Sequence, residues 1–268
     1  MDSSSQYLYP SGRIAVLTTE LMGKAGLERL DRTKDLSEFL SILSATYLRD
    51  LVPDLRDERG GEEAFADERS CLRNFIEELA PDPRVPEMIF LRDRYLKLKL
   101  DAKRKAGLMG TAEKGLEAAE KGLEDEKINR ALEIYSELKD PIVIDLVLDK
   151  EWLEELSNLA KGENSLERIA TLVRDLYSVR VKAFSKYLGK ESLLEKLEFG
   201  GLCRFDELLS LELGEIDDRI SSILFEELEK GKYEPYGVGV VALYVCRRID
   251  ELSSVRAIWL EKLLGVKG

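Results

Sequence analysis

Apolar residues recur at helical spacing along most of the chain, and the clearest example lies between residues 172 and 190. On a helical projection at about 100° per residue, the apolar side chains gather on one side and the polar side chains on the other. The apolar side carries Leu172, Val173, Leu176, Tyr177, Val179, Val181, Ala183, Phe184, Tyr187 and Leu188. Gly189 follows, and glycine commonly stands just after the last residue of a helix. The pattern therefore predicts an amphipathic helix that ends at Gly189.

A four-position skeleton within this helix recurs elsewhere in the chain. It consists of an apolar residue, then Arg or Lys, then Lys six positions further on, then Gly three or four positions later. The full copies are Val179, Arg180, Lys186 and Gly189; Leu96, Lys97, Lys103 and Gly107; and Val255, Arg256, Lys262 and Gly265. A looser copy near the start contains Gly12, Arg13, Leu21 and Gly23. The basic anchors at 13, 97, 180 and 256 are separated by 84, 83 and 76 residues, and this near-constant spacing predicts internal repetition.

The remaining periodic segments also predict helices. These segments are 13–22, 26–31, 35–51, 67–79, 89–107, 152–160, 217–229 and 240–264. Asp140 and Pro141 are a capping residue followed by a proline at the first helical position, which favours another helix start there. The alternation of Val and Ile over 142–148 is also compatible with a short strand, so both structures stay open for that segment.

Other stretches interrupt the helical pattern. Residues 54–68 contain Gly60 and Gly61 among mixed charges and are expected to form a solvent-facing loop. Three prolines between 81 and 86 predict a rigid connector. Residues 112–125 are two tandem heptads, each with a helix-weakening glycine, and are expected to form a mobile surface segment.

The order of the repeats predicts how the chain closes. The chain begins with the second part of a repeat and ends with the first part, so its two ends are expected to meet and complete one module. This arrangement predicts an all-α fold of three lobes of three helices each, related by pseudo-threefold symmetry, instead of an open solenoid with polar caps. The approximate lobe boundaries are 1–95, 96–178 and 179–268, with the helix at 240–264 packing back against the N-terminal lobe.

Two arginines violate the amphipathic pattern. Arg180 and Arg256 each fall within the apolar arc of their helix. A guanidinium there needs a carboxylate or carbonyl partner, because burying it unpaired is costly. We favour a structural ion pair between lobes; the alternatives are a side chain that reaches out to water and a contact offered to a partner protein. The repeat positions Arg13, Lys97, Arg180, Lys186, Arg256 and Lys262 are the candidate inter-lobe or interface residues.

Composition narrows the class of function. The 268 residues are 44% hydrophobic and 35% charged, which is typical of an ordered, helix-rich, soluble protein. A net charge of -12 argues against nucleic acid as a partner and against direct adsorption to an anionic membrane. The longest apolar run, 238–246, is about half of the ~20 residues that a membrane-spanning helix requires. Three widely separated cysteines favour free thiols in a reducing compartment over disulfides or a metal site.

The sequence contains no convincing catalytic motif. It has no histidine, which removes Ser-His and Cys-His nucleophilic centres and HExxH zinc sites. Asp217 and Asp218 are the only adjacent aspartates, but the further acid and the second acidic motif of magnesium-dependent prenyl-diphosphate enzymes are missing. No glycine-rich phosphate loop is present. We therefore predict no catalytic residue, no cofactor and no metal site.

Several segments together resemble a known family. The start, GRIAVLTTELMGKAGLERL followed by a Leu-rich helix that ends in Ala45-Thr46-Tyr47, is similar to the start of the C subunit of archaeal and bacterial A/V-type rotary ATPases. The ending, EPYGVGVVALYVCRRIDELSSVRAIWLEKLLGVKG, is similar to the closing helix of that family. Segments 92–97 and 175–180 resemble its repeated Asp-x-x-Asn-Leu-Lys pattern, although Tyr95 and Ser178 replace the asparagine and Arg92 replaces one leading acid. Ser254 likewise replaces the asparagine in the third copy. The resemblance extends over nearly the whole chain.

The resemblance implies a mechanical role. Members of this family, called subunit d in the eukaryotic enzyme, form a funnel on the cytoplasmic end of the membrane rotor ring and hold the foot of the central axle. The expected partners are therefore the axle subunits and the rotor ring of a complex that couples ATP to proton or sodium transport. The chain itself would be non-catalytic. The alternatives from the residues alone are a free-standing helical scaffold and a magnesium-dependent all-α enzyme built on Asp217 and Asp218.

Overall fold

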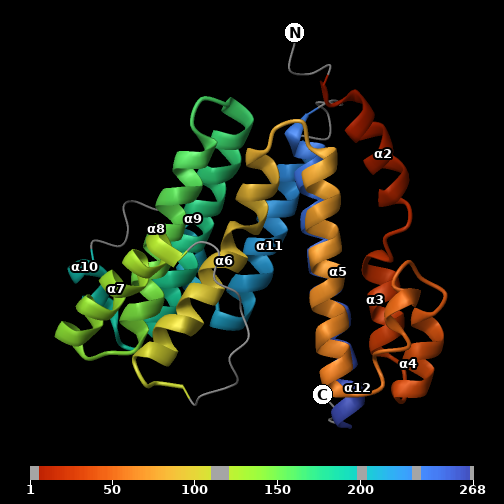
Figure 1. Ribbon diagram of the computed structural model, residues 1–268, viewed down its shortest axis with the longest axis horizontal. Helices are drawn as coiled ribbons and strands as arrows, with labels where there is room; N and C mark the ends of the chain where they lie inside the picture. The colour runs from red at the N-terminus through yellow and green to blue at the C-terminus, as the bar shows by residue number, and fades with distance from the viewer. Residues whose placement is uncertain (1–5, 110–120, 198–203, 231–236, 266–268) are drawn as a thin grey trace. The chain divides into compact units, whose positions relative to one another are not determined.

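The structure is a computed structural model that describes residues 6–109, 121–197, 204–230 and 237–265, shown in Figure 1. Every regular element in these ranges is a helix, which confirms the predicted all-α class. The chain divides into two compact units. Unit 1 comprises residues 1–89 and 228–268, and unit 2 comprises residues 90–227. The helix from 8 to 18 and the helix from 238 to 264 therefore belong to the same unit although they stand at opposite ends of the sequence.

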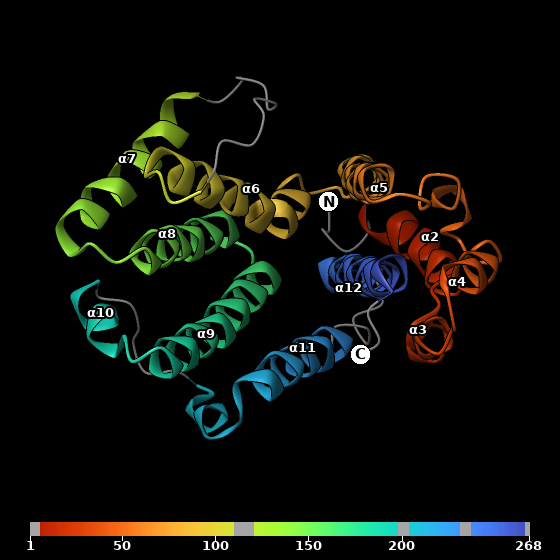
Figure 2. The same cartoon turned by 90° about the horizontal axis from the view of Figure 1, so that it is seen from below.

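Unit 1 is built around its last helix, α12 (Val238–Leu264). This helix contacts α2 (Leu8–Thr18), α3 (Gly23–Asp31), α4 (Leu36–Leu43) and α5 (Glu58–Leu79). Figure 2 shows α12, in dark blue, beside α2 and α5. The core of the unit combines early and late residues: Leu30, Phe39, Leu43, Leu48, Leu51, Leu55, Phe65, Leu252, Val255 and Trp259. The segments around 30–65 and 252–259 thus bury their apolar surface against each other.

The prediction of a loop over 54–68 is wrong from residue 58 onward. Helix α5 begins at Glu58, and its N-cap residue Asp57 accepts a 2.9 Å hydrogen bond from the backbone N–H of Gly60. Gly61 does not break the helix. A Cβ added at Gly61 would lie 2.2 Å from a ring carbon of Trp259, so the glycine allows α12 to pack closely. The indole N–H donates a 2.9 Å hydrogen bond to the carbonyl oxygen of Leu55. A long-range contact therefore overrides the weak helix propensity of glycine.

The other predicted helices differ mainly at their ends. The predicted helix at 35–51 is shorter than expected: α4 ends at Leu43, and a 3₁₀ turn, η1 (Arg49–Leu51), follows. The prolines at 81–86 stand before and inside the first turn of α6 (Arg84–Lys105). Because proline lacks a backbone N–H, the first turn is the part of a helix that tolerates it best.

Unit 2 contains most of α6, followed by α7 (Lys121–Leu138), α8 (Ile142–Ala160), α9 (Asn164–Tyr187) and α10 (Glu191–Lys196). A 3₁₀ turn, η2 (Asp206–Ser210), and most of α11 (Leu213–Lys230) complete the described part of the unit. Helix α8 packs against α7 and α9. The segment 142–148 is thus helical and not a strand. Apolar residues of α9, η2 and α11 form one core cluster: Leu172, Leu176, Val179, Leu208 and Ile223.

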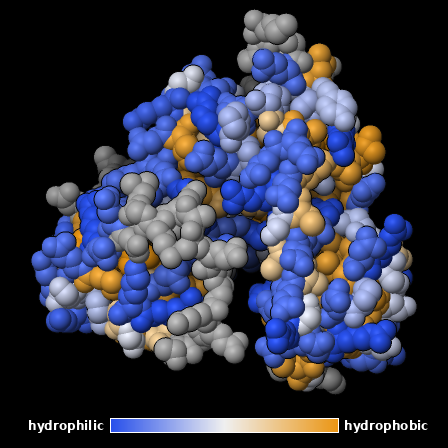
Figure 3. Space-filling model, in the orientation of Figure 1, coloured by the Kyte–Doolittle hydropathy of each residue, from blue (hydrophilic) through white to orange (hydrophobic). Residues whose placement is uncertain are grey.

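Some expectations concern residues outside the described ranges. The tandem heptads at 112–125 fall outside them as far as residue 120, and the backbone from residue 121 onward belongs to α7. No helix of the described chain is long and apolar enough to cross a membrane. On the face that Figure 3 presents, most of the surface is hydrophilic and the hydrophobic areas are small.

Candidate functional site

The glycines of the repeated skeleton share one backbone conformation. Gly107, Gly189 and Gly265 have φ angles of 71°, 65° and 65°, and Gly23 of the looser copy has 61°. Such left-handed values favour glycine, and a left-handed residue commonly follows the last turn of a helix. The first three stand just after α6, α9 and α12. Each full copy of the skeleton is therefore the C-terminal part of a helix with a glycine stop, as predicted for Gly189.

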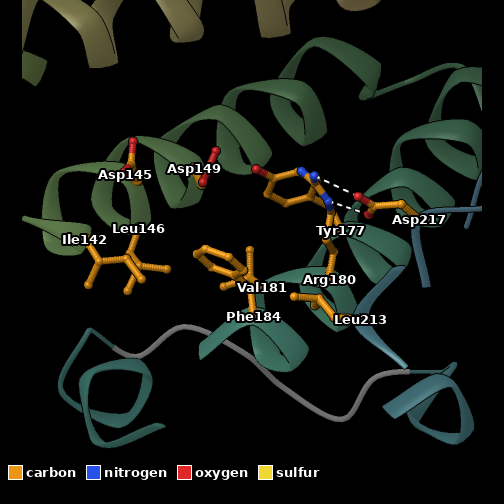
Figure 4. Close-up of a pocket in the computed structure, with 10 residues that line it drawn as sticks. All are labelled: Ile142, Asp145, Leu146, Asp149, Tyr177, Arg180, Val181, Phe184, Leu213 and Asp217. Carbon is orange, nitrogen blue, oxygen red and sulfur yellow. Dashed lines mark hydrogen bonds and ion pairs between the residues drawn. The ribbon is translucent and has the colours of Figure 1, made fainter. Parts of the chain in front are cut away.

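Arg180 of α9 forms an ion pair with Asp217 of α11. Its Nε donates to Oδ1 at 2.6 Å and its Nη2 donates to Oδ2 at 3.0 Å, as the dashed lines in Figure 4 show. The two bonds match the fork of the guanidinium to both carboxylate oxygens. The hydrogen bonds that Arg180 donates to Asp217 raise the pKa of Arg180, so Arg180 stays charged. The pair is part-exposed, with 39% of the arginine side chain and 54% of the aspartate side chain accessible.

Arg256 of α12 forms the corresponding pair with Glu62 of α5. Its Nε and Nη2 donate to the two carboxylate oxygens at 2.9 and 2.6 Å. The arginine side chain is 47% accessible, so this residue lies at the edge of the apolar arc and not inside the core. Lys262, two turns further along α12, donates a 2.7 Å hydrogen bond to the carbonyl oxygen of Asp31 at the end of α3. All of these contacts lie within unit 1.

The other candidate positions make weaker contacts or none. The guanidinium of Arg13 lies 4.9 Å from the ring centre of Phe75, and its Nη1 is 3.5 Å from the hydroxyl of Tyr9. Lys97 and Lys186 are exposed, and neither forms an ion pair within the described residues. The repeat positions therefore do not converge on one place: they fasten separate pairs of helices or face solvent.

A row of ion pairs between α6 and α8 was not anticipated from the sequence. Lys99 pairs with Asp149 at 2.5 Å, and Lys103, one turn along, pairs with Asp145 at 2.7 Å. At the other end of the row, Glu155 accepts hydrogen bonds from Arg94 and the hydroxyl of Tyr95 on α6, and also from Lys127 on α7. As the residue numbers of the basic side chains on α6 increase, those of their acidic partners on α8 decrease, which is the order expected for antiparallel helices. We call these contacts the α6–α8 ladder.

Lys99 and Asp149 are the most buried pair of the ladder. The side chains of Lys99 and Asp149 are only 11% and 10% accessible. Burial raises the pKa of Asp149, and the pairing with Lys99 opposes that rise. Tyr177 of α9 also forms a hydrogen bond with Asp149. The pKa of Tyr177 is raised, and burial is the largest cause. For Glu155, burial would raise the pKa, but the hydrogen bonds from Lys127, Tyr95 and Arg94 outweigh it and lower the pKa.

Unit 1 contains a different buried carboxylate. Glu251 of α12 is 5% accessible and accepts from the backbone N–H groups of Met22 and Gly23, at 3.2 and 2.6 Å. It also accepts a 2.9 Å hydrogen bond from the hydroxyl of Tyr47. The two N–H groups stand at the start of α3, where backbone donors have no partner within the helix. Glu251 therefore ties the last helix of the chain to one of the first, and we call this contact the Glu251 clasp.

Local spacing contains part of the signal for both missed features. The basic residues at 99 and 103 and the acids at 145 and 149 are each one helical turn apart, so a search for facing charge stripes would have found this part of the ladder. For the clasp, the only signal is an acid beside Leu252 on the apolar side of the closing helix. Its partners stand more than two hundred residues earlier in the chain.

The arrangement offers structural contacts more readily than chemistry. Among the described residues, no group of three or more His, Cys, Asp or Glu side chains could hold a metal ion. Both carboxylate oxygens of Asp217 accept from Arg180, so a cation at Asp217 would have to compete with this pair. Asp218 is exposed.

Comparisons with known proteins add no identification: no protein-family model and no curated protein matches the chain.

Proposed function

We propose that this chain is the C subunit of an A/V-type rotary ATPase or ATP synthase. In that role it is a non-catalytic socket at the cytoplasmic face of the membrane, which couples the rotating central axle to the membrane rotor ring. The first support is the resemblance of the two ends of the chain and of the repeated helices to that family. The complex as a whole would transport protons or sodium ions, while this chain would transmit torque.

The observation that carries the proposal is a repeated way of joining helices. Each of the three helices with a full skeleton forms ion pairs with a later long helix of its module: α6 with α8, α9 with α11, and α12 with α5. Helix α12 also pairs with the end of α11, through Arg247 and Glu229. We divide the chain into three successive modules: α6 to α8, α9 to α11, and α12 together with α2 to α5 from the start of the chain. Each of the three pairings then joins the first and the last long helix of one module. Three such modules are what a pseudo-threefold funnel of three-helix lobes requires.

Mechanical considerations favour the same role. A socket must keep its shape under torque, and polar or ionic contacts between helices specify the register of the helices in some proteins. A net charge of -12 suits partners with basic surfaces, since complementary charge raises association rates and specificity. The magnesium-dependent alternative depends on Asp217, whose carboxylate is already held by Arg180.

Affinity purification from the native host tests the proposal. The tagged chain is isolated from detergent-solubilised membranes and its partners are identified by mass spectrometry, with the tag alone as control. We expect the nucleotide-binding subunits, the axle subunits and the rotor ring to co-purify with it. Recovery of the chain without any ATPase subunit, from both the membrane and the soluble fraction, would exclude the role.

A salt series tests the electrostatic part separately. Binding of the purified chain to the purified axle subunits is measured between about 50 and 500 mM salt, a range over which the screening length shortens severalfold. We expect the affinity to fall as salt increases. An affinity that does not change with ionic strength would remove the argument from net charge while leaving the assembly result standing.

A further inference from the structure

A chain of hydrogen bonds connects the α6–α8 ladder to the Arg180–Asp217 ion pair. Lys99 of α6 donates to Asp149 of α8 at 2.5 Å, and the hydroxyl of Tyr177 on α9 is hydrogen-bonded to the same carboxylate. Tyr177 is also hydrogen-bonded to Arg180, which donates to Asp217 of α11. Because a carboxylate only accepts and a guanidinium only donates, the hydroxyl donates to Asp149 and accepts from Arg180. We call these five side chains the Tyr177 relay.

The relay runs from the interior of unit 2 towards its surface. The side chains of the inner pair, Lys99 and Asp149, are 11% and 10% accessible, whereas those of the outer pair, Arg180 and Asp217, are 39% and 54% accessible. Tyr177 is half-buried, and Figure 4 shows its ring between Asp149 and the guanidinium of Arg180. All five residues belong to unit 2. One hydroxyl therefore connects a part-exposed ion pair to the most buried pair of the ladder.

The relay brings two cations close to Asp149. Lys99 bonds to it directly, and Arg180 is one hydroxyl away. Asp145, one turn earlier on α8, is paired with Lys103 and is not part of this chain of bonds. A buried carboxylate without a cation is costly, and in a medium of low dielectric constant a charge one hydrogen bond further away still contributes. Arg180 is thus the cation that remains for Asp149 when Lys99 is absent.

The outer part of the relay borders open space. Asp149, Tyr177, Arg180 and Asp217 all line one pocket of about 310 Å³. Side chains in a close-packed core change partners only if their neighbours repack, but side chains that border a cavity are free of that constraint on one side. The contacts of Arg180 with Tyr177 and Asp217 can therefore adjust without a rearrangement of the core.

We propose that the Tyr177 relay couples the two ion pairs, with Arg180 as a second cation for Asp149 and with Asp217 competing for Arg180. In the intact relay, Lys99 supplies most of the compensation for the Asp149 charge. When Lys99 is lost, Arg180 takes over this role through the hydroxyl of Tyr177. The contact between α6 and α8 and the contact between α9 and α11 are then not independent of each other. The relay is a conformational device within unit 2 and does not depend on the rotary role.

A double-mutant cycle tests the coupling. Arg180→Met is introduced into the wild-type chain and into Lys99→Met, and the folding equilibrium constant is measured by urea denaturation at pH 8, which favours the ionised form of Asp149. We expect Arg180→Met to lower this constant at least about threefold more in Lys99→Met than in the wild-type chain, because Asp149 then loses both cations. A smaller ratio would overturn the proposal. Lys103→Met, which leaves Asp145 unpaired instead, is the control background and should give a ratio near one. A ratio as large as that in Lys99→Met would show that any missing ladder cation has this effect.

The role of the hydroxyl is tested by Tyr177→Phe, which keeps the aromatic ring. When the cycle is repeated in this background, the ratio should fall to near one. Tyr187→Phe is the control, because Tyr187 stands on the same helix and is 73% accessible, and it should leave the ratio unchanged. Circular dichroism of every variant shows whether it folds. If the ratio survived the loss of the Tyr177 hydroxyl, the two cations would act on Asp149 without the relay.

A second measurement avoids the destabilised Lys99 variants. The titration of the Asp149 carboxyl carbon is followed by ¹³C NMR in the full-length chain. Arg180→Met should move its midpoint to higher pH by about 0.5 unit or more, because the loss of a nearby cation disfavours the ionised carboxyl group. Asp217→Asn, which leaves Arg180 without its competing carboxylate, should move the midpoint to lower pH. Lys182→Met removes a cation of α9 that pairs with η2, and it should move the midpoint by less than about 0.2 unit. Equal shifts in Arg180→Met and Lys182→Met, or a move to higher pH in Asp217→Asn, would contradict the relay.

Failure here and failure of the proposed function are distinguishable. Coupling through Tyr177 with no co-purifying ATPase subunit would keep the relay and discard the rotary role. Co-purification of the complex with no coupling in the double-mutant cycle would keep the rotary role and discard the relay.

Discussion

The two units fasten their helices in different ways. In unit 2, the α6–α8 ladder joins two long helices through cation–carboxylate pairs, of which Lys99–Asp149 is the most buried. In unit 1, α12 is held by the packing of Trp259 onto Gly61 and by the Glu251 clasp, in which a carboxylate binds backbone N–H groups. The ladder and the clasp each bury a carboxylate, but only the ladder also buries the opposite charge. Unit 1 has a shielded ion pair as well, between Arg248 of α12 and Glu68 of α5, whose side chains are 15% and 22% accessible.

The difference has an energetic consequence. Removing one member of a buried ion pair leaves the other charge without compensation, which costs more than the pair itself contributes. A carboxylate bound to backbone N–H groups leaves only neutral donors behind when it is removed. The ladder should therefore be more sensitive than the clasp to a single change of charge.

The largest effect is expected at Lys99. The substitution Lys99→Met keeps the length and apolar stem of the side chain but leaves Asp149 buried without its cation. We expect a loss of about 3–5 kcal/mol in the free energy of unfolding, measured by urea denaturation. Lys97→Met, two residues earlier on an exposed face, is the control and should change stability by less than about 0.5 kcal/mol. A loss at Lys99 no larger than at Lys97 would mean that the ladder does not stabilise the unit.

A smaller effect is expected from the Glu251 clasp. Glu251→Ala leaves the N–H groups of Met22 and Gly23 and the hydroxyl of Tyr47 without their acceptor. Because such groups cost about 1–3 kcal/mol when buried and unsatisfied, and water can enter near the start of α3, we expect a total loss of about 2–3 kcal/mol. Tyr47→Phe removes only the hydroxyl and should cost about 1 kcal/mol. If the two losses were equal, the carboxylate would add nothing beyond its bond to Tyr47.

The sequence predicted those parts of the fold that depend on local interactions. Amphipathic spacing locates most helices, although several begin five to nine residues earlier than predicted and α7 was not predicted. The glycines of the full skeleton copies stop their helices because glycine adopts left-handed φ values without strain. The start of α5 was missed because its cause is not local. Gly60 and Gly61 weaken a helix in isolation, and the reason for Gly61 is an indole almost two hundred residues away.

The candidate contacts show the same limit. The position of Arg180 on an apolar arc indicated that it needs a partner, but nothing near it in the sequence identified Asp217. The pattern also placed Arg256 within the apolar arc, whereas its side chain is 47% accessible. Helical periodicity gives the direction of a side chain around its own helix, but it does not show how far neighbouring helices cover that direction.

The contact between Gly61 and Trp259 tests the packing of unit 1 without any change of charge. Gly61→Ala improves the helix propensity of α5 by up to about 1 kcal/mol but forces the buried indole to move. We expect a net loss of about 1–2 kcal/mol in the free energy of unfolding. The control is Gly12→Ala in α2, where an added Cβ meets no atom within 4 Å, and this variant should be neutral or stabilising. A stabilised Gly61→Ala protein would show that the indole moves at little cost.

The smallest effects on stability are expected at the part-exposed arginine pairs, and there the assembly provides the sharper measurement. Arg180→Ala and Arg256→Ala each remove an ion pair whose side chains are 39–54% accessible, so each should cost no more than about 1 kcal/mol. If the two residues serve only to join helices, both variants should still co-purify with the partners of the wild-type chain. If either is also an interface contact, that variant should lose its partners at nearly unchanged thermal stability. A stability loss above about 3 kcal/mol at Arg180 would instead place its pair among the buried contacts, beside Lys99 and Asp149.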